Sequence, residues 1–153
     1  MVAKEQGGSP RVAAEAWEEL FRAQVTLMRR FEATDDFAPL TAREYDVLFQ
    51  LSRGPGGAGA LRDLAELILL TQPSPSQRVD RLSVRGLVER RSVPDDARGV
   101  VVALTEEGAR LQREIGRRHV RTIRRYVGGA LDDDELHTLG RLANKLRTAQ
   151  RDL

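Results

Sequence analysis

The stretch of sequence that decides the fold covers residues 74–108 and reads SPSQRVDRLSVRGLVERRSVPDDARGVVVALTEEG. Its first part predicts a helix over residues 71–85. Thr71 or Ser74 is the expected N-cap, and prolines occupy the first turn, where a missing N–H costs little. Gly86 is expected to end this helix, because glycine readily adopts the left-handed conformation that follows a helix C-terminus.

The inward face of this helix is predicted to hold Val79, Leu82 and the stem of Arg78. After it come two β-rich runs, residues 87–93 and 100–104, separated by a polar turn. This pattern predicts a β-hairpin.

A second short helix is expected just upstream, around residues 61–69, with Leu64, Ala65 and Ile68 facing inward. A short helix, a turn and an arginine-bearing helix make a helix-turn-helix, whose second helix fits the DNA major groove. The hairpin that follows is then a wing. Its Arg98, expected at or near the tip of the turn, can reach the DNA backbone or a minor groove.

Longer helices flank this central part. Ser9 and Pro10 mark the start of an amphipathic helix that reaches about residue 33, and Thr41 opens the next helix with a capping box. Another helix begins at Thr105, and residues 132–135 open the last one with a second capping box. Residues 53–59 are expected to form a loop, which is glycine-rich but lacks the Gly-Lys-Ser/Thr ending of a phosphate-binding loop.

Composition excludes several classes of protein. The chain has 153 residues, of which 41% are apolar, enough for one core, and no run approaches the ~20 apolar residues of a membrane span. The first ten residues lack the apolar core of a signal peptide, so we expect a cytoplasmic protein that is not bound to a membrane. With no cysteine and two histidines, a disulfide scaffold, a thiolate zinc site and a thiol nucleophile are excluded. We expect no metal, no cofactor and no catalytic residue.

The basic residues are almost all arginine, 23 of 25. Arginine suits phosphate and base-edge contacts, although a GC-rich genome also favours it. Residues 110–125 carry seven arginines and one acid, Glu114. Their spacing spreads them around a helix, so we interpret them as solvated surface and as intersubunit partners of acids such as residues 132–135. On the same helix, His119 falls on the apolar stripe and is expected to be packed or at an interface.

The central motifs resemble the MarR family of winged helix-turn-helix transcriptional regulators. The resemblance covers about residues 10–150, and it rests above all on residues 95–108, an Asp…Arg wing followed by Leu-Thr-Glu-Glu-Gly. Leu-Thr-Gln-Pro, Ser-Gln-Arg-Val-Asp-Arg-Leu and Arg-Gly-Leu-Val-Glu-Arg upstream also match. Two residues depart from the family pattern: Pro75 stands where a small or aliphatic residue is usual, and Arg78 where an aliphatic one is common.

The resemblance implies a mainly α fold with a small β-hairpin wing. The winged helix-turn-helix would span about residues 37–104, and the dimerisation helices about residues 10–34 and 105–150. It further implies a homodimer that binds a pseudo-palindromic DNA operator, acts as a repressor, and is released by a small aromatic or anionic effector.

Two sets of candidate site residues follow. The candidates for DNA binding are Ser74, Ser76, Gln77, Arg78, Arg81, Arg91 and Arg98. The candidates for effector binding are Trp17, Phe21, Arg30, Tyr45 and Phe49. Each set has a plainer interpretation. The polar residues could form a solvated helix face, Arg98 could pair with Asp95 or Asp96, and aromatic residues at helical spacing are commonly core.

Two other functional classes stay open. A winged helix can serve as a protein-interaction module, which would show no salt-dependent affinity for DNA. An enzyme would need a nucleophile–base pair or paired carboxylates in a cleft, whereas the acids of this chain fall at helix caps and turns.

Overall fold

The computed structural model describes residues 7–67, 74–93 and 96–150, and for residues 66, 67 and 96–98 it describes the backbone alone. Backbone contacts divide the chain into two compact units, residues 1–35 and residues 36–153. Within the described ranges, no helix is both long enough and apolar enough to cross a membrane.

The first unit contains one helix, α1 (Pro10–Ala33). Its bounds agree with the sequence prediction, and Ser9 stands at the N-cap position, although its side chain makes no capping hydrogen bond. Ion pairs with i,i+4 spacing join Arg11 to Glu15 and Arg22 to Glu18, both at 2.6 Å. Exposed pairs of this kind stabilise a helix by a few tenths of a kcal/mol each.

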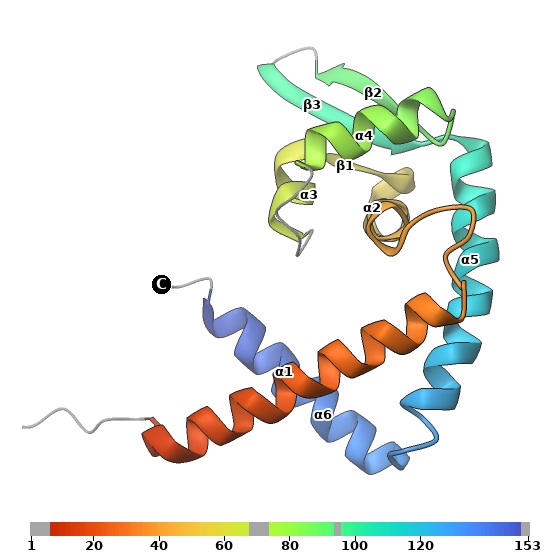
Figure 1. Ribbon diagram of the computed structural model, residues 1–153. Coiled ribbons are helices and arrows are strands. Elements are labelled where there is room, and N and C mark those ends of the chain that lie inside the picture. The colour runs from red at the N-terminus through yellow and green to blue at the C-terminus, as the bar shows by residue number, and fades with distance from the viewer. Residues whose placement is uncertain (1–6, 68–73, 94–95, 151–153) are drawn as a thin grey trace, which may run out of the picture. The chain divides into compact units, whose positions relative to one another are not determined.

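The second unit is a winged helix followed by two helices (Figure 1). Its elements are α2 (Ala42–Arg53), the 3₁₀ turn η1 (Pro55–Gly57), β1 (Ala58–Ala60), α3 (Leu61–Leu67), α4 (Pro75–Val84), β2 (Val88–Val93), β3 (Asp96–Leu104), α5 (Glu106–Tyr126) and α6 (Asp133–Ala149). The mainly α fold with a small β-hairpin wing is therefore confirmed.

The strands form one antiparallel sheet in the order β1-β3-β2. In it Ala58 pairs with Ala103 and Val88 with Leu104. The prediction of a loop over residues 53–59 was wrong at its end, because β1 lies there. Its sequence, Ala-Gly-Ala, has no β-branched residue and no alternation. Pairing with β3, rather than local propensity, makes it a strand.

The wing also differs in detail from its prediction. β3 begins at Asp96, so Arg98 belongs to this strand and not to the turn. The pairing register shifts between Ser92, which faces Val100, and Val93, which faces Asp96. Arg98 therefore lies in the part of β3 where the pairing with β2 is irregular.

Capping boxes begin two of the helices, as predicted. At α2 the Thr41 hydroxyl accepts a hydrogen bond from the Glu44 N–H at 3.2 Å, and the Glu44 carboxylate accepts one from the Thr41 N–H at 2.9 Å. Asp132 and Glu135 make the same reciprocal pair at α6. Each box satisfies two backbone donors that a helix start leaves free.

The core of the second unit lies where α2, α3, α4 and α5 meet the sheet. Val47, Leu48, Val79, Leu82 and Ile115 are fully buried there. On α3 only part of the predicted inward face is confirmed. Leu64 is buried, Ala65 is exposed, and Ile68 lies outside the described residues.

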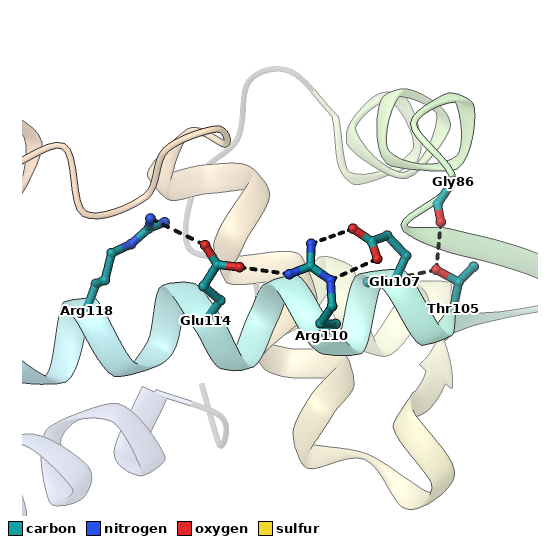
Figure 2. A network of polar contacts seen from close by, with 7 residues as sticks. Gly86, Thr105, Glu107, Arg110, Glu114 and Arg118 are labelled. Atoms are coloured by element: carbon teal, nitrogen blue, oxygen red, sulfur yellow. Dashed lines mark hydrogen bonds and ion pairs between the residues drawn. The ribbon is translucent and has the colours of Figure 1, made fainter.

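A close junction joins the end of α4 to the start of α5. Gly86 has φ +72°, and the N–H groups of Gly86 and Leu87 donate back to Ser83 and Leu82, which ends α4 in a Schellman motif. Thr105 then binds this turn. Its N–H donates to the Leu87 carbonyl at 3.1 Å and its hydroxyl to the Gly86 carbonyl at 2.6 Å (Figure 2).

Gly108 allows this close approach. A Cβ at position 108 would lie 1.9 Å from the carbonyl oxygen of Leu87, far inside van der Waals contact. The Gly108 N–H also donates to the Thr105 hydroxyl at 3.0 Å, which caps α5. The absence of a side chain at this position therefore sets how near α5 comes to the end of α4.

We predict that Gly108→Ala lowers the free energy of unfolding by about 1–3 kcal/mol, because the backbone must move to admit the methyl group. Gly140→Ala is the matched control. Gly140 is also helical, has no neighbouring atom within 4 Å of a built Cβ, and should gain up to about 1 kcal/mol from helix propensity. Urea unfolding of both variants at one protein concentration tests this. Equal unfolding midpoints for Gly108→Ala and the wild type would contradict the role of the junction.

Candidate nucleic-acid interface

The start of α4 is built by Ser74 and Pro75. The Ser74 hydroxyl accepts a hydrogen bond from the Gln77 N–H at 3.3 Å, and Pro75 occupies the first helical position. Of the two predicted N-caps, Ser74 is therefore the one the structure has, and α4 begins later than predicted. Thr71 lies outside the described residues.

Arg78 points into the core and not toward solvent. Its exposed fraction is 1%, and it lies on the same inward face as Val79 and Leu82. The predicted inward stem is confirmed, and the predicted DNA contact of Arg78 is wrong for this conformation, because a buried side chain cannot reach a groove. The sequence departure at position 78 thus marks an arginine in a core position.

The surroundings of Arg78 are charged. Burial lowers the pKa of Arg78, the nearby cation Arg43 lowers it further, and the carboxylate of Asp46 on α2 acts in the opposite direction. Burial likewise raises the pKa of Asp46, against a hydrogen bond from Gln50 and the charge of Arg78. A buried charge is tolerated only where such opposite charges and hydrogen bonds accompany it.

The outward face of α4 carries the remaining candidates. Gln77 and Arg81 are exposed, and Ser74 and Ser76 are half-buried at the first turn. Arg81 makes no ion pair with any described residue. Its guanidinium is therefore available to a phosphate or a base edge.

Arg90 on β2 connects the wing to α4. This contact was not among the predictions from the sequence. Its Nη2 atom donates to the Ser76 carbonyl at 3.1 Å, to the Ser76 hydroxyl at 3.0 Å and to Asp80 Oδ1 at 2.8 Å. A signal was present in the sequence. Side chains alternate along a strand, so Arg90 shares a face with the buried Val88, and β2 packs against α4.

Arg91, the neighbouring candidate, forms an ion pair with Glu89 on the same strand. Its side chain remains exposed, so a phosphate contact would have to compete with that carboxylate. The side chain of Arg98 and its suggested pairing with Asp95 or Asp96 lie outside the described part. Its role stays a prediction.

The effector candidates form two aromatic pairs, one in each unit. In α1 the rings of Trp17 and Phe21 stack with centroids 6.0 Å apart and are largely exposed, and Arg30 is exposed as well. In α2 the rings of Tyr45 and Phe49 lie 6.1 Å apart. The predicted one-turn spacing of each pair is therefore present.

Tyr45 is more buried than the other effector candidates. Its ring packs against Phe37 at 5.5 Å and His119 at 6.2 Å. Burial raises the pKa of the Tyr45 hydroxyl, against a hydrogen bond with Gln112. His119 packs 4.6 Å from the Phe37 ring, with its Nδ1 atom 3.3 Å from Asp36 Oδ2, so the predicted packed histidine is confirmed. Among the described residues, no group of three histidine or acidic side chains is placed to hold a metal.

Known proteins are similar to this chain in sequence and in architecture. The family model described as "MarR family" matches residues 38–99, which include α2, α3, α4 and most of the hairpin. The HTH-type transcriptional regulator PecS of Dickeya dadantii (strain 3937) is 27% identical over 131 residues, which cover 83% of this chain and 79% of PecS. Residues 38–99 are thus similar to the MarR family.

Two solved structures illustrate the similarity. Sco3205, a MarR family transcriptional regulator from Streptomyces coelicolor solved in complex with DNA, has a TM-score of 0.79 at 24% identity, covering 96% of this chain and 92% of Sco3205. NadR, solved in complex with 4-hydroxyphenylacetate, has a TM-score of 0.69 at 26% identity, covering 95% of this chain and 97% of NadR. Both similarities show that the chain has the fold of these proteins.

The arginine-rich helix α5 is partly neutralised by acidic residues on the same helix. Arg110 pairs with Glu107 at 2.6 Å and with Glu114 at 2.9 Å, and these hydrogen bonds raise the pKa of Arg110 (Figure 2). Arg118 lies 3.6 Å from Glu114 and also donates to the carbonyl of Ala38. The other five arginines of residues 110–125 are exposed, which supports their interpretation as solvated surface. Their pairing across subunits stays a prediction.

The two arginines of α4 should respond differently to mutation. We predict that Arg81→Ala weakens binding to duplex DNA and lowers the salt slope by about one if Arg81 meets a phosphate. Arg78→Met, which fills a similar space without charge, should leave that slope unchanged because residue 78 is buried. Fluorescence anisotropy at several salt concentrations, on a duplex that the wild type selects from a randomised pool, measures both.

Stability provides the complementary readout. Arg78→Ala should lower the free energy of unfolding by about 2–5 kcal/mol, since it empties a filled core position, whereas Arg81→Ala should stay within about 0.5 kcal/mol. A reduced salt slope for Arg78→Met would mean that Arg78 leaves the core when DNA binds.

Proposed function

We propose that the protein is a homodimeric repressor that binds a pseudo-palindromic operator and releases it when a small aromatic or anionic effector binds. The observation that carries the DNA-binding part is the two-sided character of α4. Arg78, Val79 and Leu82 fix the helix in the core, while Gln77 and Arg81 are exposed beside a wing. A helix held in this way can enter a major groove as a rigid element.

The proposed DNA contacts come from α4 and from the hairpin. The residues concerned are Ser74, Ser76, Gln77 and Arg81 on α4, with Arg91 on β2 and Arg98 on β3. Arg98 and Arg91 would meet the backbone or a minor groove, since a wing lies beside the recognition helix. Sco3205, a protein of the same fold, was solved with DNA, which supports this use of the fold.

The proposed dimer rests on apolar side chains that one chain leaves exposed. Leu139, Leu142 and Leu146 of α6 are 44%, 46% and 56% exposed, and they share one helix face. Val120 on α5 and Leu20 on α1 are exposed as well. A helix face with several exposed apolar side chains usually marks an interface. We therefore assign α1, α5 and α6 to dimerisation and residues 37–104 to DNA binding.

A two-fold dimer explains the form of the proposed operator. Two copies of α4 related by a two-fold axis would read two inverted half-sites about one helical turn apart, ~10–10.5 bp from centre to centre. An effector would act by binding one dimer state better than another. The expected coupling is ~1–3 kcal/mol, roughly 5–150-fold in DNA affinity.

The proposed effector is a small aromatic acid. The aromatic pairs Trp17–Phe21 and Tyr45–Phe49 supply flat apolar surfaces, and Arg30 supplies a cation for an anionic group. NadR, a relative at 26% identity, was solved with 4-hydroxyphenylacetate, a ligand of this chemical type.

We predict that Leu142→Glu converts the dimer to a monomer and abolishes binding to the selected duplex, because it places a carboxylate on the apolar face of α6. Sedimentation should show about twice the 17.1 kDa chain mass for the wild type and one chain mass for the variant. Arg141→Glu, on the opposite side of α6, is the matched control and should stay dimeric. A wild-type monomer that binds no duplex in a salt-dependent manner would favour a protein-interaction module instead.

We predict that Trp17→Ala reduces the thermal stabilisation by 4-hydroxyphenylacetate and leaves DNA affinity without effector nearly intact. Val12→Ala, another exposed apolar position of α1, is the control. Thermal denaturation with increasing ligand measures the first effect, and anisotropy on the selected duplex measures the second. If Trp17→Ala instead dissociates the dimer or unfolds the chain, Trp17 is an interface residue and not an effector contact.

A further inference from the structure

The contact between Arg90 and α4 determines which hydrogen bonds Ser76 can make. The Nη2 atom of Arg90 carries two hydrogens and has three acceptors, the carbonyl and hydroxyl oxygens of Ser76 and Oδ1 of Asp80. One hydrogen is therefore shared between two acceptors. The Arg90 and Asp80 side chains are 34% and 64% exposed, so the cluster lies at the surface and not in the core.

The direction of the Arg90–Ser76 hydrogen bond is fixed by chemistry. A guanidinium has five N–H donors and no acceptor, so the Ser76 hydroxyl must accept from it. A hydroxyl has one proton of its own, and here that proton cannot be used toward Arg90. Within the described ranges the Ser76 proton has no acceptor.

We propose that Arg90 is a positioning residue that makes Ser76 a hydrogen-bond donor toward the operator. This inference rests on the proposed DNA binding by α4. Ser76 then selects an acceptor, either on a base edge, such as a purine N7, guanine O6 or thymine O4, or on a phosphate oxygen. A base donor such as cytosine N4 or adenine N6 could use only the second lone pair of the Ser76 oxygen, because Arg90 engages the first.

The neighbouring residues at the start of α4 also offer hydrogen-bond donors to a partner. The Ser74 hydroxyl accepts from the Gln77 N–H, which leaves its own proton for another acceptor. Pro75 contributes no N–H, and Arg81 can only donate. Gln77 has both an acceptor and donors on its side chain. The presented face of α4 is therefore rich in donors, which complements the acceptor-rich DNA backbone and guanine edge.

Asp80 gives Arg90 a second role. This carboxylate stands on the helix proposed to enter a groove, where an unpaired negative charge would repel phosphates. The 2.8 Å contact with Arg90 offsets that charge locally. The same guanidinium therefore offsets an unfavourable charge on α4 and orients a favourable donor.

The first experiment tests whether Ser76 donates to DNA. The full-length wild type and Ser76→Ala are measured on the selected duplex and on versions of it that lack one acceptor each. Analogues of purine N7, guanine O6 and thymine O4 report base contacts, and methylphosphonates report phosphate contacts. We expect Ser76→Ala to bind the unmodified duplex roughly two- to tenfold more weakly. One modification should weaken the wild type by a similar factor without further weakening the variant.

The second experiment tests the role of Arg90. Arg90→Lys keeps a donor-only cation beside Ser76, whereas Arg90→Gln introduces an amide oxygen that can take the Ser76 proton. We expect Arg90→Lys to keep the wild-type preference for the acceptor found in the first experiment, and Arg90→Gln to lose most of it. Asp80→Asn removes the carboxylate charge while keeping the arginine, so it separates the charge effect from the effect on Ser76.

The outcomes separate this inference from the proposed function. If the wild type binds no duplex in a salt-dependent manner, the proposed function fails and this inference fails with it. If the wild type binds but every modification affects the wild type and Ser76→Ala equally, the inference alone is overturned. Equal preferences in Arg90→Lys and Arg90→Gln would overturn the positioning role of Arg90. Unfolding midpoints of all variants at one concentration identify any loss of folding.

Discussion

The close packing of α5 against the end of α4, at the carbonyl of Leu87, is the contact on which the arrangement of the second unit depends. There the Schellman turn that ends α4 meets the start of α5, and Gly108 is the residue that lets the two backbones come within contact distance. Thr105 holds the junction through its N–H and its hydroxyl. Because β2 begins directly after this turn and β3 ends directly before Thr105, the same contact sets the end of α4, the base of the wing and the direction of α5.

α4 is held on two sides by different physical means. On its inner side, Val79, Leu82 and the buried Arg78 place it against the core, with Asp46 opposing the cost of burying a cation. On its outer side, Arg90 reaches from the wing to Ser76 and Asp80. The helix and the wing therefore present one surface. This rigidity matters for DNA recognition, because base-edge contacts require side chains to be placed before binding.

The charged side chains of α5 form a row of ion pairs, which its arginine-rich composition does not suggest. Glu107, Arg110, Glu114 and Arg118 alternate in sign along the helix (Figure 2). Arg118 also donates to the carbonyl of Ala38. Arg85, at the end of α4, donates to the neighbouring carbonyl of Pro39. Two basic side chains from different helices thus hold the segment before α2, so this segment, the end of α4 and α5 are connected by hydrogen bonds.

The sequence by itself determined the order of the helices and the capped starts of α2 and α6. Capping boxes at Thr41 and Asp132 and the glycine after α4 act between residues at most a few positions apart, so they can be read without a fold. It did not show the strand β1, the burial of the Arg78 guanidinium or the contact of Arg90 with α4. Each of these depends on a partner distant in the chain: β1 on β3, Arg78 on α2, and Arg90 on α4. Whether an arginine is a solvated, buried or positioning group is decided by the charges and acceptors that the tertiary structure brings beside it.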